Sequence, residues 1–511
     1  MNTYDVILLG SSPNALTAAT YLAKAGKQVL VLEPTSNFGG VAATTSFAEG
    51  FQADLSLMSG RLDAQIVQEL QLSDYGLEVI ERNSITSLLP DQSSFTLFGH
   101  KSIAAGVIQK FNVNDGLSYL EFTQLLDLAT DLLKAAYRSA PPQAHHPSAS
   151  EAEQLANLVS QLRGYGRREM TEVIRLLVMS VRDLLDEWFE NPRLKGLLAS
   201  LSVRGLTQGP FASGTTFNLL HHLTIGDGYF RATAKGGIGA ISQALAKAAQ
   251  SFKAELRLNT RVSSIVINDG VATGVKLESG EVINASTVIS DFDARYTFTK
   301  LISPVEFEPE FNREVQHIRY KGSVARINLA LSELPDFIGI NEEALKGTLV
   351  VAPSVAYLEK AFDCAKYGKL SDHPVMEICI PSLSDSTLAP TGKHIMSIWL
   401  QYTPYHGKVS QDQVKELVLE QLSLFAPNLR SLVSHSQVLT PQDFEESFNL
   451  SEGHLYGGDM TLAQAFFLRP LPGFAKYNSP IQQLYLCGSA THPGGGISGL
   501  AGRNLANIFS N

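Results

Sequence analysis

The residues whose types and spacing are most typical of a binding site form a short turn near the start of the chain, Gly10-Ser-Ser-Pro-Asn-Ala15. An apolar run at residues 4–9 precedes the turn, and an Ala- and Leu-rich helical stretch at 14–26 follows it. A glycine turn between a buried strand and a helix is typical of dinucleotide sites, because the helix N-terminus presents free N–H groups and the positive end of its dipole to the phosphates. The segment therefore predicts a dinucleotide-binding turn.

The turn departs from the usual G-x-G-x-x-G pattern at its second glycine. Gly10 keeps the first glycine, Ser12 replaces the second, and Ala15 is an accepted variant of the third. We expect the small Ser12 side chain to fit, with its hydroxyl donating to a phosphate oxygen. Pro13 suits the first position of a helix, where the missing N–H costs least.

An acidic residue follows the turn at the expected distance. Glu33 ends a second apolar strand at residues 28–33, 23 positions after Gly10. A carboxylate at this place typically accepts a hydrogen bond from a ribose 2′-hydroxyl. No Arg follows Glu33 directly, which disfavours a 2′-phosphate. The strand–helix–strand context favours a nucleotide site over a turn with a purely structural role.

Three further segments resemble one family. They are Glu33-Pro-Thr-Ser-Asn-Phe-Gly-Gly-Val-Ala42, then Lys235-Gly-Gly-Ile-Gly-Ala-Ile-Ser-Gln-Ala-Leu245 leading to Leu258-Asn-Thr-Arg-Val262, and Leu484-Tyr-Leu-Cys-Gly-Ser-Ala-Thr-His-Pro-Gly-Gly-Gly-Ile-Ser-Gly499. Together they resemble the phytoene desaturase and carotenoid isomerase family of FAD-dependent oxidoreductases. Gly457–Met460 and Phe466–Pro470 look like its branch called pyridine nucleotide-disulphide oxidoreductase domain-containing protein 2.

The resemblance implies FAD as the cofactor and a place for each motif. Pyrophosphate contacts are implied for Gly10, Ser12, Pro13, Asn14 and Ala15, a ribose contact for Glu33, a backbone contact with adenine for Val262, and contacts along the flavin half for Gly39, Gly40, Val41, Gly488, Gly495, Gly496, Ile497 and Ser498. The glycines at 494–496 agree with this physically, because they remove side chains where backbone must lie against a flat ring.

The fold class expected is α/β and α+β. The resemblance implies a discontinuous Rossmann-like FAD-binding domain from residues 1–75, 230–298 and 455–511, and a mixed-sheet substrate domain from 76–229 and 299–454. Leucines recur at helical spacing between about 114 and 205, which predicts a helical cap on the substrate domain.

The activity implied is the dehydrogenation (desaturation) or isomerisation of a hydrophobic, carotenoid- or lipid-like substrate. The electron acceptor, the catalytic residues and the oligomeric state stay open. One alternative is an amine oxidase-like enzyme, marked by an aromatic pair that faces the flavin. Another is a non-catalytic interaction scaffold with a degenerate cofactor site, which the replacement of the second glycine by Ser12 leaves open.

Four other side chains are candidates for a place near the flavin or the substrate. We favour a structural hydrogen bond for His492 over catalysis, and ordinary packing for His221 and His222 over a place at the substrate. We expect Arg469 to pair with an internal carboxylate rather than with an anionic substrate.

Composition excludes some classes of partner. The net charge is −10 without a long basic run, which disfavours nucleic acid. Three scattered cysteines indicate neither a disulfide framework nor a metal site, and we expect no metal. Without a basic leader or a long apolar run, we expect a cytoplasmic protein. A peripheral membrane contact through the cap helices is the alternative.

Overall fold

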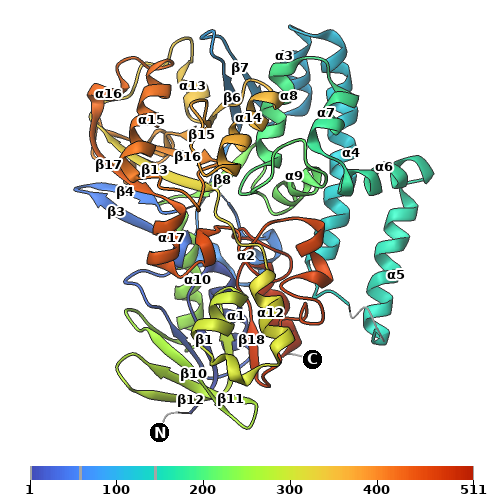
Figure 1. The fold of residues 1–511 in the computed structure, drawn as a ribbon, viewed down its shortest axis with the longest axis vertical. Coiled ribbons are helices and arrows are strands. Elements are labelled where there is room, and N and C mark those ends of the chain that lie inside the picture. Colours follow the sequence, from blue (N-terminus) through green and yellow to red (C-terminus); the bar gives the residue numbers. More distant parts are fainter. Residues whose placement is uncertain (1–2, 57–59, 143–146, 510–511) are drawn as a thin grey trace.

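Two seven-stranded sheets organise the computed structural model, which describes residues 3–56, 60–142 and 147–509 (Figure 1). In spatial order the first sheet contains β10 (Val262–Asn268), β11 (Val271–Leu277), β12 (Val282–Ser290), β1 (Thr3–Leu9), β2 (Val29–Leu32) and β9 (Glu255–Arg257), with β18 (Leu484–Leu486) paired to β12. The pairs that join β12, β1, β2, β9 and β18 are parallel, whereas β10, β11 and β12 pair antiparallel.

The parallel core of this sheet follows from its sequence. β1 and β2 are nearly continuous apolar runs, which suits strands covered on both faces. Helix α1 (Pro13–Lys24) packs beside α10 (Gly239–Ser251) and α18 (Leu500–Ile508). A Cβ on Gly502 would lie 1.9 Å from the carbonyl oxygen of Asn14, so a glycine in α18 allows this close approach.

The second sheet is mixed, as predicted for the substrate domain. Its order is β17 (Val433–Leu439), β13 (Val324–Leu331), β16 (His394–Gln401), β15 (Val375–Cys379), β14 (Thr348–Val351), β6 (Ser84–Leu88) and β7 (Ser94–Phe98). All neighbours are antiparallel except β14 and β6. Strand-like runs at 324–331, 347–352, 375–380 and 394–402 predict β13 to β16, whereas no such run predicts β17, β6 or β7.

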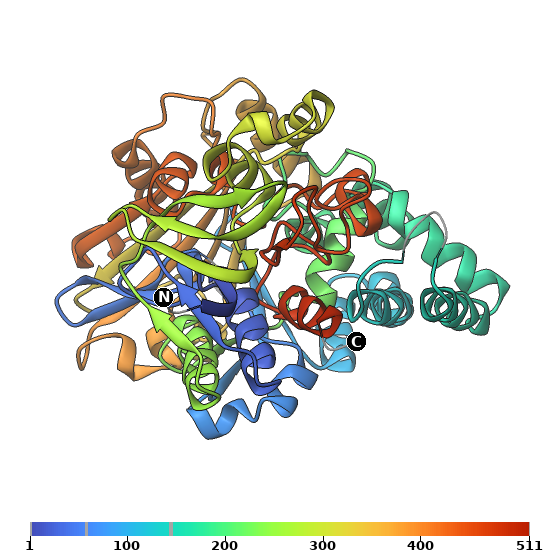
Figure 2. The same ribbon diagram turned by 90° about the horizontal axis from the view of Figure 1, so that it is seen from below.

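Helices form a third region at the side of both sheets (Figures 1 and 2). The predicted cap contains α4 (Val113–Tyr137), α5 (Ala149–Gly164), α6 (Arg167–Val178), α7 (Val181–Trp188) and α8 (Pro192–Ser202). Helix α9 (Thr215–Thr224) packs against α4 and α8. None of the helices in the described part of the chain is both long and apolar enough to cross a membrane.

Shorter elements connect these layers. They are the strand pairs β3 (Thr44–Ala48) with β4 (Phe51–Asp54) and β5 (Val79–Arg82) with β8 (Arg231–Ala234), and the helices α2 (Ala64–Glu69), α3 (Lys101–Gln109), α11 (Ala294–Lys300), α12 (Pro309–His317), α13 (Glu342–Leu345), α14 (Val355–Lys366), α15 (Gln411–Ser423), α16 (Leu429–Leu432) and α17 (Pro441–Phe448). The fold class expected from the sequence is confirmed, whereas the exact domain boundaries stay a prediction.

Candidate cofactor and substrate site

The first glycine of the dinucleotide turn is required by its surroundings. Gly10 has a φ of +99°, and its N–H donates to the carbonyl oxygen of Leu32 over 2.8 Å. A Cβ at this position would lie 3.0 Å from the Cβ and Oδ2 atoms of Asp291. The residue therefore needs both the left-handed conformation and the missing side chain of glycine.

Ser12 begins α1 and is held by an acidic partner. Its N–H donates to Oδ2 of Asp291 over 2.8 Å, and its hydroxyl donates to Oδ1 over 2.6 Å. The hydroxyl oxygen also caps the helix by accepting from the N–H of Ala15 at 3.4 Å. In this structure the hydroxyl donates to Asp291, so its donation to a phosphate oxygen stays a prediction.

Glu33 is almost fully buried, with 2% of its surface exposed, at the end of β2. Its carboxylate accepts from the Ser11 hydroxyl at 2.5 Å and from the backbone N–H of Thr35 at 2.9 Å. The Ser11 oxygen in turn accepts from the N–H of Gly39 at 3.0 Å. Ser11 therefore links the carboxylate of Glu33 to the Gly39–Gly40 pair. The sequence analysis did not predict this role.

One slot connects the turn, Glu33 and the C-terminal glycine segment. Ten predicted cofactor residues line it: Gly10, Ser12, Pro13, Asn14, Glu33, Gly39, Gly40, Val41, Gly496 and Ile497. Val262 lines an adjoining pocket, and Pro34 and Phe292 belong to both. The segments thus meet along a continuous path, although they lie far apart in the sequence.

The glycines at 494–496 lie against side chains from two other segments. A Cβ on Gly495 would lie 2.4 Å from Cβ of Tyr456, and a Cβ on Gly496 would lie 2.4 Å from Cδ1 of Ile225. Gly494 meets the sulfur of Met460 in the same way, at 2.5 Å. Side chains are therefore excluded where this turn packs against the interior of the protein.

Besides Val262, four predicted residues do not line the slot itself: Ala15, Gly488, Gly495 and Ser498. They support the residues that do. A Cβ on Gly488 would lie 2.0 Å from the carbonyl oxygen of Asp291, and the carbonyl of Ser498 accepts from the N–H of Asp63 at 2.9 Å.

His221 packs directly behind the glycine turn. Its Nε2 lies 3.1 Å from the carbonyl oxygen of Gly495, and its Nδ1 lies 3.0 Å from the hydroxyl of Tyr137. Because a carbonyl can only accept, Nε2 carries the proton and Nδ1 accepts from Tyr137. Burial and the neighbouring His222 hold the pKa of His221 well below its ordinary value. His221 thus has a positioning role that exceeds ordinary packing.

His492 has the structural role that was expected. It is buried, and its Nε2 lies 3.3 Å from the carbonyl oxygen of Ala136. Burial lowers its pKa to about 3, so the ring is neutral.

The expectation for Arg469 is wrong. Its Nη2 donates to the carbonyl oxygens of Gly457 at 2.8 Å and of Tyr456 and Ser489 at 3.0 Å. The loop at 456–457 and the segment that leads into the glycine turn converge here, and their carbonyl groups take the place of the predicted carboxylate.

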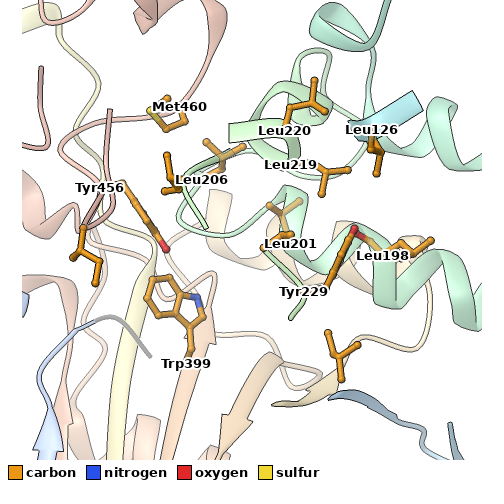
Figure 3. Close-up of a cluster of buried hydrophobic side chains, with 14 of the residues drawn as sticks. Leu126, Leu198, Leu201, Leu206, Leu219, Leu220, Tyr229, Trp399, Tyr456 and Met460 are labelled. Carbon is orange, nitrogen blue, oxygen red and sulfur yellow. The ribbon is translucent and has the colours of Figure 1, made fainter. Parts of the chain in front are cut away.

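A buried apolar cluster lies next to the turn (Figure 3). Figure 3 shows Tyr456 between Trp399 and Leu206, with Met460 near Leu206 and with Leu220 beside Leu219 further along the cluster. The rings of Trp399 and Tyr456 have centroids 6.1 Å apart. The hydroxyl of Tyr456 donates to Asp227 over 3.0 Å.

Asp227 belongs to a buried group of charges beside this cluster. It accepts from Nη1 of Arg204 at 2.9 Å, while Glu377 accepts from Arg204 and, at 2.6 Å, from Arg231. Both carboxylates therefore have cationic partners from this chain.

The sequence analysis also missed Asp291 and Phe292 as slot residues. They follow β12 directly, and β12 lies parallel to β1. Ligands of such sheets bind at the carboxyl ends of the strands, so this rule was the available signal. The residues between 447 and 455 that line the slot carry no comparable signal.

The slot fits a dinucleotide. The Oδ1 atom of Asn14 is buried without a hydrogen-bond partner, and this residue lines the slot at the start of α1. Ribose or ribityl hydroxyls are donors that such an acceptor needs. Among the described residues, no group of three or more His, Cys, Asp or Glu side chains is arranged to hold a metal ion.

Comparison with known proteins decides the family. The sequence pattern of the "flavin containing amine oxidoreductase" family matches residues 16–501. The chain belongs to this family. It is 34% identical to pyridine nucleotide-disulfide oxidoreductase domain-containing protein 2 of Rattus norvegicus, over 99% of the chain and 93% of that protein. It is 26% identical to a lycopene-forming phytoene desaturase of Pantoea ananas, over 97% and 96% respectively.

The fold agrees with this flavin-dependent amine oxidoreductase family. The structure of a putrescine oxidase matches with a TM-score of 0.61 over 100% of both chains, at 18% identity. Together with the family assignment, this makes the chain an FAD-dependent oxidoreductase. Glu33 would hold the adenosine ribose, the α1 turn the pyrophosphate, and Gly39, Gly40 and Gly496 the flavin half.

Proposed function

We propose that this flavin-dependent oxidoreductase dehydrogenates or isomerises a hydrophobic, carotenoid- or lipid-like substrate. The chemistry that bound FAD would supply is the acceptance of a hydride from a substrate C–H bond. The chain binds the cofactor, orients the substrate and keeps water away.

The observation that carries this proposal is the apolar character of the interior next to Gly494–Gly496. Met460 and Ile225 contact the glycines themselves, and Leu206 and Leu220 lie in the cluster beyond them (Figure 3). Such side chains favour a hydrocarbon over a charged group, because unpaired charge in an apolar site is costly. The similarity to phytoene desaturases over nearly the whole chain supports the same substrate class.

The buried carboxylates also favour a neutral substrate. An amine substrate enters as a cation and needs an acceptor or a carboxylate that is free to pair with it. Asp227 and Glu377, two acidic groups beside the cluster, are already bonded to Arg204 and Arg231. Asp459, next to Met460, accepts from the hydroxyl of Thr207 at 3.0 Å and lies 3.4 Å from Nε2 of His454. A further cation near these arginines would be repelled.

An amine oxidase is the second candidate, because the family description and the putrescine oxidase fold favour it. Such an enzyme is expected to have an aromatic pair that faces the flavin, and the Trp399–Tyr456 pair is the candidate for it. However, the Tyr456 hydroxyl is committed to Asp227. We therefore rank amine oxidation below dehydrogenation of an apolar compound.

The test is reduction of the bound flavin under anaerobic conditions. The purified yellow protein is mixed with phytoene in detergent micelles, with lipid extracted from the protein itself, or with putrescine, and the flavin absorbance is followed. Bleaching by phytoene or by the lipid but not by the amine supports the proposal. Bleaching by putrescine, with peroxide released on admission of oxygen, assigns an amine oxidase instead. A protein that bleaches with none of them, and that leaves the double-bond geometry of phytoene and of the extracted lipid unchanged, contradicts both candidates.

A further inference from the structure

An acidic side chain lies at the N-terminus of α1, where the pyrophosphate is expected. Asp291 accepts both from the N–H and from the hydroxyl of Ser12, at 2.8 and 2.6 Å. The N–H groups in the first turn of a helix have no intrahelical partner and are the usual donors to a dinucleotide pyrophosphate. In α1 one of these donors is already bound to a carboxylate.

The slot offers little positive charge to offset this carboxylate. Its described lining contains Glu33 and Asp291 but no Lys, Arg or His. Two other titratable groups are near Asp291. Cys487 directly follows β18 and interacts electrostatically with Asp291, and Asp293 lies two residues further along the chain. Among the described residues of the slot, the positive charge that could attract a phosphate comes from the N-terminus of α1, and it is only a partial charge.

We propose that Asp291 makes FAD binding proton-linked: the carboxyl group takes up one proton when the pyrophosphate reaches the N-terminus of α1. The inference rests on the FAD site but not on the identity of the substrate. A protonated carboxyl keeps an acceptor oxygen for Ser12 and gains an O–H that donates to a phosphate oxygen. The same group therefore changes from a repulsive anion to a ligand of the cofactor.

The titration range suits this role. Burial raises the pKa of Asp291 to about 6, the two hydrogen bonds from Ser12 oppose the rise, and the charge of Glu33 adds to it. Below this pH the free protein is already protonated and FAD binds without proton uptake. Above it each pH unit reduces the protonated fraction tenfold, so the dissociation constant of FAD rises by up to about tenfold per unit.

The experiment compares full-length wild type with Asp291→Asn. Both proteins are depleted of flavin and titrated calorimetrically with FAD at pH 5.5, 6.5, 7.5 and 8.5, in two buffers with different ionisation enthalpies. Asn keeps the shape and supplies the N–H donor of the protonated form. We expect wild type to bind more weakly as pH rises and to take up close to one proton at pH 7.5 and above. We expect Asp291→Asn to bind at least tenfold more tightly than wild type at pH 8.5, without pH dependence.

A carboxylate-to-amide change at Glu33 is the matched control. Because the Glu33 charge raises the pKa of Asp291, Glu33→Gln keeps the pH dependence but moves it to lower pH, on top of a general loss of affinity. Wild-type affinity that is independent of pH overturns the inference, as does a pH dependence that Glu33→Gln abolishes. If neither wild type nor Asp291→Asn binds FAD at any pH, the FAD function itself fails.

Discussion

Nε2 of His221 donates to the carbonyl oxygen of Gly495 over 3.1 Å, at the back of the glycine turn. Nδ1 of the same ring accepts from the hydroxyl of Tyr137 at the end of α4. The cap helix, α9 and the turn are thus joined in series by one neutral imidazole. Since burial holds the pKa of His221 well below its ordinary value, this arrangement does not change between pH 6 and 8.

Replacing the ring by an apolar one tests this support. We expect His221→Phe to weaken FAD binding by about 5- to 100-fold, because a buried carbonyl that loses its donor costs about 1–3 kcal/mol. The measurement is fluorescence titration of the flavin-depleted protein with FAD. Tyr137→Phe is the control, since it removes the donor to Nδ1 but leaves the bond to Gly495. An equal loss in both variants would show that general packing, rather than the Gly495 bond, is responsible.

The glycine turn can be tested by adding a single methyl group. We expect Gly495→Ala to lose most of its bound FAD, because the new Cβ would lie 2.4 Å from Cβ of Tyr456 and the backbone must shift. Gly106→Ala in α3 is the matched control, because a Cβ there meets nothing within 4 Å and alanine stabilises a helix by about 0.5–1 kcal/mol. The flavin-to-protein absorbance ratio after purification gives the answer. Full flavin content in Gly495→Ala would contradict the steric argument.

The buried charges behind the cluster give a stability prediction. We expect Glu377→Gln to destabilise the protein by about 3–5 kcal/mol, because it leaves Arg204 and Arg231 without a shared buried carboxylate. Thermal unfolding followed by circular dichroism measures the loss. The double variant Arg231→Met/Glu377→Met should recover part of it, since Arg204 keeps Asp227. A single variant as stable as wild type would mean that water reaches these arginines.

An ion pair between α2 and α18 predicts acid sensitivity. Two nitrogens of Arg503 donate to the Glu69 carboxylate over 3.0 and 2.9 Å, and these bonds lower the pKa of Glu69 to about 2. An unfolded Glu has a pKa of about 4.3, so the contribution is complete above that pH and disappears as pH falls towards 2. Because one third of the Glu69 side chain is exposed, we expect only about 1–2 kcal/mol.

This prediction is checked by urea unfolding at pH 6 and pH 3. Glu69→Gln should lower the midpoint at pH 6 and have a smaller effect at pH 3. The exposed Glu310, paired with Arg313, supplies the control Glu310→Gln, which should change neither midpoint. A Glu69→Gln effect of equal size at both values would point to lost packing instead of lost charge.

Much of the cofactor half could be predicted because its constraints are local. A buried strand, a glycine turn and a helix follow one another within residues 4–26, and Glu33 closes the unit. The resemblance at 484–499 then brought the distant glycines into the same site. The slot that joins Glu33 to Gly496 agrees with that reasoning.

The remainder depends on pairings between distant segments. Asp291 is an ordinary acidic residue after a strand until β12 pairs with β1 and brings it against Ser12. Arg469 was expected to need a carboxylate, but its surroundings offer backbone carbonyls from two converging loops. The edge strands β6 and β7 are short and only partly apolar, so periodicity did not separate them from loops.

The pairing of β18 with β12 also sets an order of events during synthesis. Residues 484–498 reach the first sheet only after the whole substrate half has left the ribosome, because they come later in the chain. The turn at Gly10–Ala15 is therefore synthesised long before the glycines at 494–496. We therefore expect a chain that ends before β18 to retain no FAD, because it lacks the glycines at 494–496.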